Sequence, residues 1–161
     1  RGINNNQELH NLSQLAQDQR DNLVLHFDIL PEQWINFKTR LSWSNYKLSN
    51  KTSGVAIAQD ANFYWGRFKL YSRYSIFNTD DFNNRQYFYE NDLLYAFSIP
   101  ALFGRGTRYY LMARIDLTKD ITLWTKYSKT RFADRDVLGS GNEEIMGNKR
   151  SELRFQLRYT F

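Results

Sequence analysis

The sequence predicts an all-β fold, an antiparallel up-and-down sheet, on three observations. From Asp21 onward, apolar and polar residues alternate with a period of two, which is the side-chain period of a β-strand. Turns and polar loops separate the alternating segments, which gives about eight candidate strands. Tight turns and longer loops follow one another along the chain, as expected when successive strands run up and down.

The C-terminal segment, 152–161, shows the alternation without exception. One face of a strand over this segment would be wholly apolar or aromatic, with Leu153, Phe155, Leu157, Tyr159 and Phe161. The opposite face would be wholly polar, with Glu152, Arg154, Gln156, Arg158 and Thr160. The last strand is therefore predicted to have one apolar face and one polar, water-exposed face.

The same alternation continues upstream. It predicts regular strands over 22–29, 35–44 and 107–117, and less regular strands over 54–65, 67–77, 85–98 and 121–132. Residues 1–19 are rich in Asn and Gln and are predicted to form a polar lead or loop. Residues 20–161 are then a single region of strands.

A soluble sheet would alternate in the same way, because one of its faces packs on a core. Three features favour a membrane-spanning barrel instead. The alternation persists to Phe161, where soluble domains usually fray. Aromatic residues cluster near predicted strand ends, as they do at the two membrane interfaces. These residues are Trp34, Trp43, Tyr46, Trp65, Tyr109, Tyr159 and Phe161.

The third feature is the charge on the polar face, which a water-filled or plugged lumen accepts. The charged residues predicted to face the lumen are Lys38, Arg40, Arg73, Glu90, Asp92, Arg108, Arg114, Lys126, Arg154 and Arg158, with Lys69, Asp28, Asp60, Asp116 and Glu152 on the same face. The residues predicted to face lipid on the last strand are Leu153, Phe155, Leu157, Tyr159 and Phe161. We therefore predict a transmembrane antiparallel barrel of the outer-membrane type, with seven or eight of its strands in this chain.

Three structural expectations follow from this prediction. The apolar side chains should point outward, leaving no hydrophobic core inside the barrel. The strands should not close on themselves, because the barrel is expected to be larger than this chain. Basic and acidic residues of the lumen are interleaved, so cross-strand pairs should neutralise one another and leave at most a weak anion preference. The alternative is a lumen filled by side chains and loops.

The connections leave one conflict open. Tight turns are predicted at 31–33, 65–67 and 118–120, short polar loops at 49–54 and 78–84, and a long loop at 133–150. Two turns on the same side of the membrane must be separated by an even number of strands. Three candidate strands lie between the turns at 65–67 and 118–120. If the C-terminus and the turn at 118–120 are periplasmic, the turn at 65–67 therefore cannot be periplasmic unless one of the three is not a strand of the wall. Either 85–98 belongs to an extracellular excursion, or the turn at 65–67 faces outward.

Composition excludes several other classes. No stretch approaches the ~20 apolar residues of a spanning helix, so a helical membrane protein is excluded. The mean hydropathy of -0.66 still permits a barrel, because only every second strand residue faces lipid. The chain has no cysteine, which excludes disulfides and thiolate metal sites. Its net charge of +5 could suggest nucleic acid, but basic residues on solvated strand faces are the favoured explanation.

Several motifs, in order, resemble the C-terminal part of a family of Bacteroidota outer-membrane proteins that carry an upstream helix-hairpin-helix domain. These motifs are FNTDDF (77–82), YENDLLYAFSIP (89–100), GRGTRYY (104–110), DRDVLGSG (134–141) and QLRYTF (156–161). Members of the family are longer, so the resemblance implies that this chain is a piece of a longer protein. The chain departs from the family by lacking the helix-hairpin-helix module, so we expect no nucleic-acid partner for this segment.

The sequence contains few residues in the patterns typical of catalytic or metal-binding sites. The two histidines are His10, in the polar lead, and His26, which shares a strand face with Asp28 as any two residues at that spacing would. No paired histidines at ligand spacing occur, and no cofactor or metal is predicted. Asp80, Asp81, Asp134 and Asp136 could hold Ca²⁺, but their spacing is not that of a calcium-binding loop, and capping of loops is the favoured explanation.

Three function hypotheses remain at this point. The first is a non-enzymatic outer-membrane barrel, serving as a channel, transporter or envelope scaffold with a polar, net-basic lumen and membrane lipid around it. The second is a barrel subunit of a larger envelope complex, with protein partners bound at extracellular loops. The third, disfavoured by the scarcity of histidine, is a membrane-embedded hydrolase.

Overall fold

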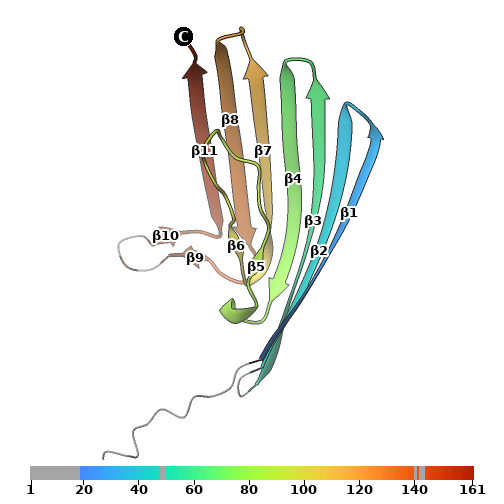
Figure 1. Cartoon of the computed structure of the whole chain (residues 1–161). Helices are drawn as coiled ribbons and strands as arrows, with labels where there is room; N and C mark the ends of the chain where they lie inside the picture. Colours follow the sequence, from blue (N-terminus) through green and yellow to red (C-terminus); the bar gives the residue numbers. More distant parts are fainter. Residues whose placement is uncertain (1–18, 48–49, 140, 142–143) are drawn as a thin grey trace, which may run out of the picture.

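Seven strands form one antiparallel sheet in chain order (Figure 1). The computed structural model describes residues 19–47, 50–139, 141 and 144–161, and this part of the chain is all-β, with no α-helix. The strands of the sheet are β1 (Gln19–Glu32), β2 (Ile35–Lys47), β3 (Lys51–Trp65), β4 (Phe68–Thr79), β7 (Arg105–Asp116), β8 (Ile121–Phe132) and β11 (Lys149–Tyr159). Each strand pairs with its neighbour in sequence except where β4 meets β7 and β8 meets β11 across longer connections.

The antiparallel sheet confirms the predicted all-β fold class. Seven of the eight candidate strands are present, with ends that differ from the predicted ones by a few residues. The eighth, 85–98, is not a strand of the sheet. Residues 80–104 instead leave β4, cross one face of the sheet and return to β7 (Figure 1). Of the two alternatives left open by the connections, residues 85–98 therefore form an excursion and not a strand of the sheet. Residues 1–18 of the predicted polar lead lie outside the described residues.

The connections between strands lie at two opposite ends of the sheet, and the two longest, β4–β7 and β8–β11, lie at the same end (Figure 1). The short links β1–β2, β3–β4 and β7–β8 share one end with the C-terminus, and we call this the turn end. The connections β2–β3, β4–β7 and β8–β11 share the other, the loop end. The β8–β11 connection includes a small hairpin of β9 (Val137–Leu138) and β10 (Ile145–Met146).

The two faces of the sheet differ in what covers them. Residues 80–104 lie over one face, which we call the inner face, and the opposite face, the outer face, stays bare. Strand β3 shows the sorting: Ala56, Ala58 and Asp60 are buried on the inner face, whereas Val55 and Ile57 are exposed on the outer face. This sorting follows from the period of two that the sequence displays.

The sheet is open. Strand β1 pairs only with β2, and β11 pairs only with β8, so each presents one unpaired edge. All residues of β1 are exposed. The expectation that the strands do not close on themselves is confirmed, and closure into a barrel is not observed within the described residues.

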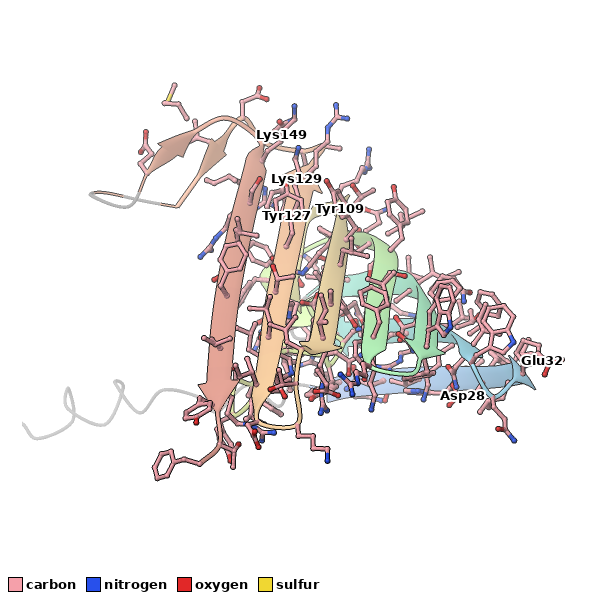
Figure 2. The ribbon with its side chains drawn as sticks, turned by 90° about the horizontal axis from the view of Figure 1, so that it is seen from above. Asp28, Glu32, Tyr109, Tyr127, Lys129 and Lys149 are labelled. Atoms are coloured by element: carbon pink, nitrogen blue, oxygen red, sulfur yellow. The ribbon has the colours of Figure 1, made fainter. Side chains whose placement is uncertain are left out.

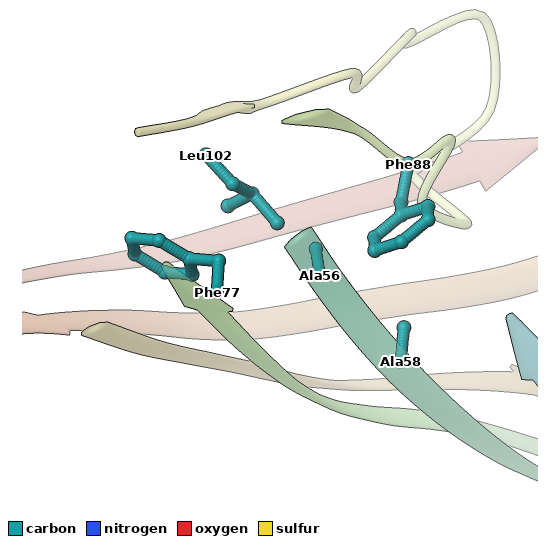
Figure 3. Close-up of a cluster of buried hydrophobic side chains, with 5 residues drawn as sticks. All are labelled: Ala56, Ala58, Phe77, Phe88 and Leu102. Atoms are coloured by element: carbon teal, nitrogen blue, oxygen red, sulfur yellow. The ribbon is translucent and has the colours of Figure 1, made fainter. Parts of the chain in front are cut away.

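The inner face carries apolar clusters, which corrects the expectation that no hydrophobic core lies inside. In the first cluster, Phe88 and Leu102 from residues 80–104 pack on Ala56, Ala58 and Phe77 of β3 and β4 (Figure 3). A second cluster is formed by Leu93, Tyr110, Met112 and Trp124. Both clusters exist because a segment of the chain lies on the inner face and buries apolar side chains against it.

Within the described residues, no helix is long and apolar enough to cross a membrane.

Candidate functional site

The segment 80–104, hereafter the inserted loop, is the main feature of the inner face. It begins with a short 3-10 helix, η2 (Phe82–Asn84), and its two arms pair through β5 (Gln86–Tyr87) and β6 (Ala101–Leu102). A further bridge joins Glu90 to Ser98. Contacts of its residues reach strands from β2 to β11, so the loop spans most of the sheet.

The base of the inserted loop is fixed to β3. Asp81 caps η2 by accepting a 3.0 Å hydrogen bond from the backbone N–H of Asn84, and its other oxygen accepts one of 2.9 Å from Thr52. Gly54 lies directly beneath, where an added Cβ would approach Asn84 O to 2.5 Å. Glycine is therefore required for this close approach of two backbones.

Buried serines of β2 hold the next part of the loop. Gln86 Nε2 donates a 2.7 Å hydrogen bond to Ser44 Oγ, and Ser42 Oγ donates to Gln86 Oε1. All three side chains are buried. Because buried polar groups are costly unless paired, these bonds fix the path of the loop over β2.

A cross-strand ion pair supports the middle of the loop. Arg73 of β4 faces Asp60 of β3 in the strand register and contacts both carboxylate oxygens, with 2.8 Å between Nη2 and Oδ2. Its remaining nitrogen, Nη1, donates a 2.7 Å hydrogen bond to the backbone oxygen of Tyr89. Arg40 Nη2 lies 3.6 Å from the same Asp60 carboxylate. The Arg73–Asp60 pair is buried and links the sheet to the loop backbone.

Glu90 is a buried charge of the loop. The residue is 1% exposed, and its carboxylate accepts two hydrogen bonds from Arg108 of β7, of 2.6 Å and 2.9 Å. Lys126 of β8 lies 3.3 Å from Glu90 Oε2. Two cations from neighbouring strands thus surround one buried carboxylate, an arrangement in which the attraction offsets the cost of removing the charges from water.

Asp92 extends this network to the edge strand β11. Its carboxylate is fully buried, 3.3 Å from Lys126 Nζ and 3.0 Å from Arg154 Nη1. Lys126 therefore lies between two loop carboxylates, with its ammonium 4.9 Å from the centre of the Tyr110 ring. A 3.1 Å hydrogen bond from Gln156 Nε2 to Leu94 O gives β11 a second contact with the loop.

The electrostatic balance at Glu90 favours its charged form. Burial alone would raise the pKa of this carboxyl, but the hydrogen bond from Arg108 and the charges of Arg108 and Lys126 outweigh burial and hold the pKa below its ordinary value of 4.5. Glu90 lies on the loop rather than on a strand of the sheet. Its ionised state at neutral pH keeps the loop bound to β7 and β8.

Most charges of the inner face are paired, though less often across neighbouring strands than the sequence predicts. The pairs Asp28–Lys38, Asp60–Arg73 and Asp60–Arg40 do join adjacent strands. The Asp116 and Glu152 carboxylates instead pair along their own strands, with Arg114 and Arg154. Glu90 and Asp92 reach the sheet from the inserted loop. Placing those two on a strand of the wall was wrong, because their segment crosses the inner face.

The structure places the predicted site residues on two faces. The basic residues predicted to face the lumen all belong to inner-face positions: Lys38, Arg40, Arg73, Arg108, Arg114, Lys126, Arg154 and Arg158. It brings Arg73, Arg108, Lys126 and Arg154 together around the loop. Arg114 and Arg158 lie apart from it, with their guanidinium carbons 5.5 Å and 5.6 Å from the Trp124 ring centre. On β11, the exposed outer-face residues are Leu153, Phe155, Leu157 and Tyr159, with Phe161 just beyond the strand.

A cavity of about 700 Å³ remains between the inserted loop and β8 and β11. Its walls include Arg108, Arg150 and Arg154, the Glu152 carboxylate of β11, and Phe97 and Leu102 from the loop. The loop therefore fills the inner face over β3, β4 and β7 but leaves space beside the open edge of β11.

Three of the four aspartates considered for Ca²⁺ have other partners. Asp80 Oδ2 accepts from the backbone N–H of Ser53 at 2.8 Å, Asp81 caps η2, and Asp134 accepts from the N–H of Arg105 at 3.2 Å. Across the described ranges, no three His, Asp or Glu side chains come close enough to hold a metal ion. His26 is exposed on β1, and His10 lies outside the described residues.

Sequence reasoning missed the residues that anchor the loop through hydrogen bonds. Gln86, Asn84, Ser42 and Ser44 carry no charge and fit no motif. The alternation does place Ser42 and Ser44 on the polar face of β2. Their partners could be found only once the path of the loop was known.

Comparison of the chain with protein-family models, with curated proteins and with solved structures gave no match in any of the three.

Proposed function

We propose that the chain is part of the wall of a non-enzymatic outer-membrane β-barrel whose lumen is closed by the inserted loop. The observation that carries the proposal is the sorting of side chains between the two faces. The outer face is apolar yet exposed, whereas the inner face holds buried charges and polar groups. A soluble sheet of this kind would bury its apolar face, whereas a membrane barrel turns that face toward lipid.

The outer face has the layout of a lipid-facing surface. Between the turn end and the row of Leu111, Tyr127 and Leu153, the outer-face positions of β4, β7, β8 and β11 form an uncharged band. In this band Leu157 is 64% exposed and Leu111 is 48% exposed. Aromatic rings flank this band. Trp34, Trp65 and Phe68 surround an apolar groove of about 650 Å³ at the turn end, and Tyr74 and Tyr109 lie toward the loop end. Rings of this type favour the headgroup level of a bilayer.

The open edges extend the proposal. Unpaired strand edges cannot face hydrocarbon, because their backbone donors and acceptors would lack partners. In the proposed barrel, further strands pair with β1 and β11 and complete the wall. The resemblance to a family of longer Bacteroidota outer-membrane proteins supports a source for those strands in the same polypeptide.

The inserted loop favours a closed barrel over an open porin. Its buried ion pairs and two apolar clusters occupy the space that an open channel would leave to water. Passage of a solute would require the loop to leave Arg108, Lys126 and Arg154. The proposed role is therefore a transporter that opens by loop movement or, where the loop stays fixed, an envelope scaffold.

A second candidate is a barrel subunit that binds partners through its loop end. The β9–β10 hairpin favours it, because this hairpin projects beyond β11 (Figure 1) and exposes 80% of Met146. An exposed apolar side chain on a projecting hairpin is suited to contact another protein.

Conductance separates these roles. The protein is reconstituted into planar bilayers beside a variant carrying Glu90→Gln and Asp92→Asn, which removes the two loop carboxylates that contact Arg108, Lys126 and Arg154. We expect the unmodified protein to insert and conduct little, and the variant to conduct more. Steady porin-like conductance of the unmodified protein would contradict a closed lumen, and failure to insert into any bilayer would contradict the membrane proposal.

A further inference from the structure

Three cations gather on the outer face at the loop end. Lys129 and Arg131 lie on β8, and Lys149 is the first residue of β11. We call these three residues the basic cluster. Arg131 and Lys149 occupy directly opposed positions of the β8–β11 ladder, and Lys129 is two residues along the same face. Like charges directly opposite each other destabilise a sheet, so this arrangement calls for an anion that offsets the repulsion.

Hydroxyl groups surround the basic cluster. A groove of about 270 Å³ is lined by the three cations together with Tyr74, Thr107 and Tyr109. In the register, Tyr109 faces both Tyr74 and Lys129, and Thr107 faces Arg131. Figure 2 shows Lys129, Lys149, Tyr109 and Tyr127 close together near the β9–β10 hairpin. Ammonium, guanidinium and hydroxyl donors in one groove are the groups that bind phosphate oxygens.

No described carboxylate neutralises the cluster. The ion pairs among the described residues lie on the inner face or in the loop-end connections, and none includes Lys129, Arg131 or Lys149. The outer-face positions of β2, β3, β4, β7, β8 and β11 contain no Asp or Glu. Three positive charges therefore share one groove without an acidic partner from the same surface.

The groove adjoins the apolar band. The next outer-face row toward the turn end holds Leu111, Tyr127 and Leu153, and Leu111 and Leu153 are about half exposed. A molecule bound at the basic cluster could thus lay apolar chains along this row while its charged group stays at the cations. Free phosphate would contact only the basic cluster, whereas a lipid would contact both the basic cluster and the apolar row.

We propose that the basic cluster binds the phosphate group of an anionic lipid in the surrounding leaflet. This inference rests on the proposed membrane location and adds a ligand class and a site to it. Lys129 and Lys149 contact the phosphate from two strands, Arg131 adds a planar pair of donors, and the tyrosine hydroxyls complete the oxygen contacts. The lipid chains lie on Leu111 and Leu153.

The test compares two double variants with the same loss of charge. Lys129→Gln with Lys149→Gln removes two charges of the cluster, and Arg67→Gln with Lys119→Gln removes two from the turn end. Each protein is reconstituted into phosphatidylcholine bilayers containing a minor share of phosphatidic acid, and the co-purified lipid is measured by native mass spectrometry. We expect enrichment of phosphatidic acid in the unmodified protein, a loss on the order of tenfold in the first variant, and little change in the second.

The outcomes are distinguishable. Equal loss in both variants, or no enrichment in the unmodified protein, would overturn the site. Complete displacement of the lipid by inorganic phosphate would show that the groove binds a free anion instead. If the double variant fails to fold, Lys149→Gln alone serves, since this residue begins its strand. Failure to insert into pure phosphatidylcholine would count against the membrane proposal, whereas insertion without enrichment would count only against this lipid site.

Discussion

Glu90 and Arg108 are joined by two hydrogen bonds, of 2.6 Å and 2.9 Å, although one residue belongs to the inserted loop and the other to β7. Lys126, from the next strand, lies 3.3 Å from the same carboxylate. Through these contacts a single buried side chain ties the loop to two strands. The loop is therefore bound to the sheet by charge as well as by the apolar packing around Phe88 and Leu93.

Neutralising Glu90 should loosen the loop. Glu90→Gln leaves Arg108 and Lys126 buried without one of their carboxylates, and breaking a buried ion pair costs about 3–5 kcal/mol. We expect faster proteolytic cleavage within 80–104 and a lower free energy of unfolding. The matched control is Glu152→Gln, whose carboxylate is half exposed beside Arg154 and should matter little. Equal effects of the two substitutions would contradict the anchoring role of Glu90.

The stability that Glu90 contributes to binding of the inserted loop should be lost at low pH. Because the pKa of Glu90 is lowered by its contacts with Arg108 and Lys126, the stability it contributes is complete above the ordinary value of 4.5 and is lost as the pH falls below that value toward the folded pKa. Loop protection from proteolysis or hydrogen exchange should be constant from neutral pH to near 4.5 and then decline. In Glu90→Gln this acid step should shrink, and an unchanged step would assign it to another group.

Charge on the two faces of β11 should have opposite consequences. Leu157→Arg places a charge in the exposed apolar band and should cost about 2–4 kcal/mol in a bilayer if it lies near the midplane. Gln156→Arg, one residue away on the inner face, should cost much less. Denaturant titration of the protein folded in lipid vesicles measures both. A larger penalty at Gln156 than at Leu157 would reverse the assignment of the faces.

The close approach at Gly54 can be tested by adding one side chain. Gly54→Leu would drive its side chain into Asn84, whose backbone oxygen lies 2.5 Å from the added Cβ. We expect the base of the loop to shift, weakening the bonds of Asn84 to Thr52 and Asp81. Exchange of the Asn84 amide reports this shift. Gly66→Asn is the control, because that position has a left-handed φ of 53° and open space around it.

The alternation of residues predicted the seven strands and their faces because a strand in a sheet leaves a period of two in its sequence. The same period misled at 85–98. In that segment Gln86, Phe88 and Glu90 are buried while Tyr87 and Tyr89 are exposed. An extended loop lying on a surface therefore alternates as a strand does, although its backbone pairs with no strand of the sheet.

The ion pairs required information that alternation does not contain. Asp60 and Arg73 could be placed on one face from the sequence, but their pairing depends on the register of β3 and β4. The pairing of Glu90 with Arg108 depends on the path of a loop. The residue types alone allow many acid–base pairings. The fold determines which of these residues lie close enough to pair.

The span of the inserted loop also orders the events of folding. The strand pairs form largely between neighbours in sequence, so they can assemble hairpin by hairpin with little loss of chain entropy. The loop, in contrast, bonds to Ser42 on one side and to Arg154 on the other, 44 and 62 residues from its own partners. It can acquire all its contacts only after β2, β3, β4, β7, β8 and β11 are aligned. Binding of the loop to the inner face is then a late step of folding. The loop can make its contacts only with a sheet whose strands have paired in the correct register.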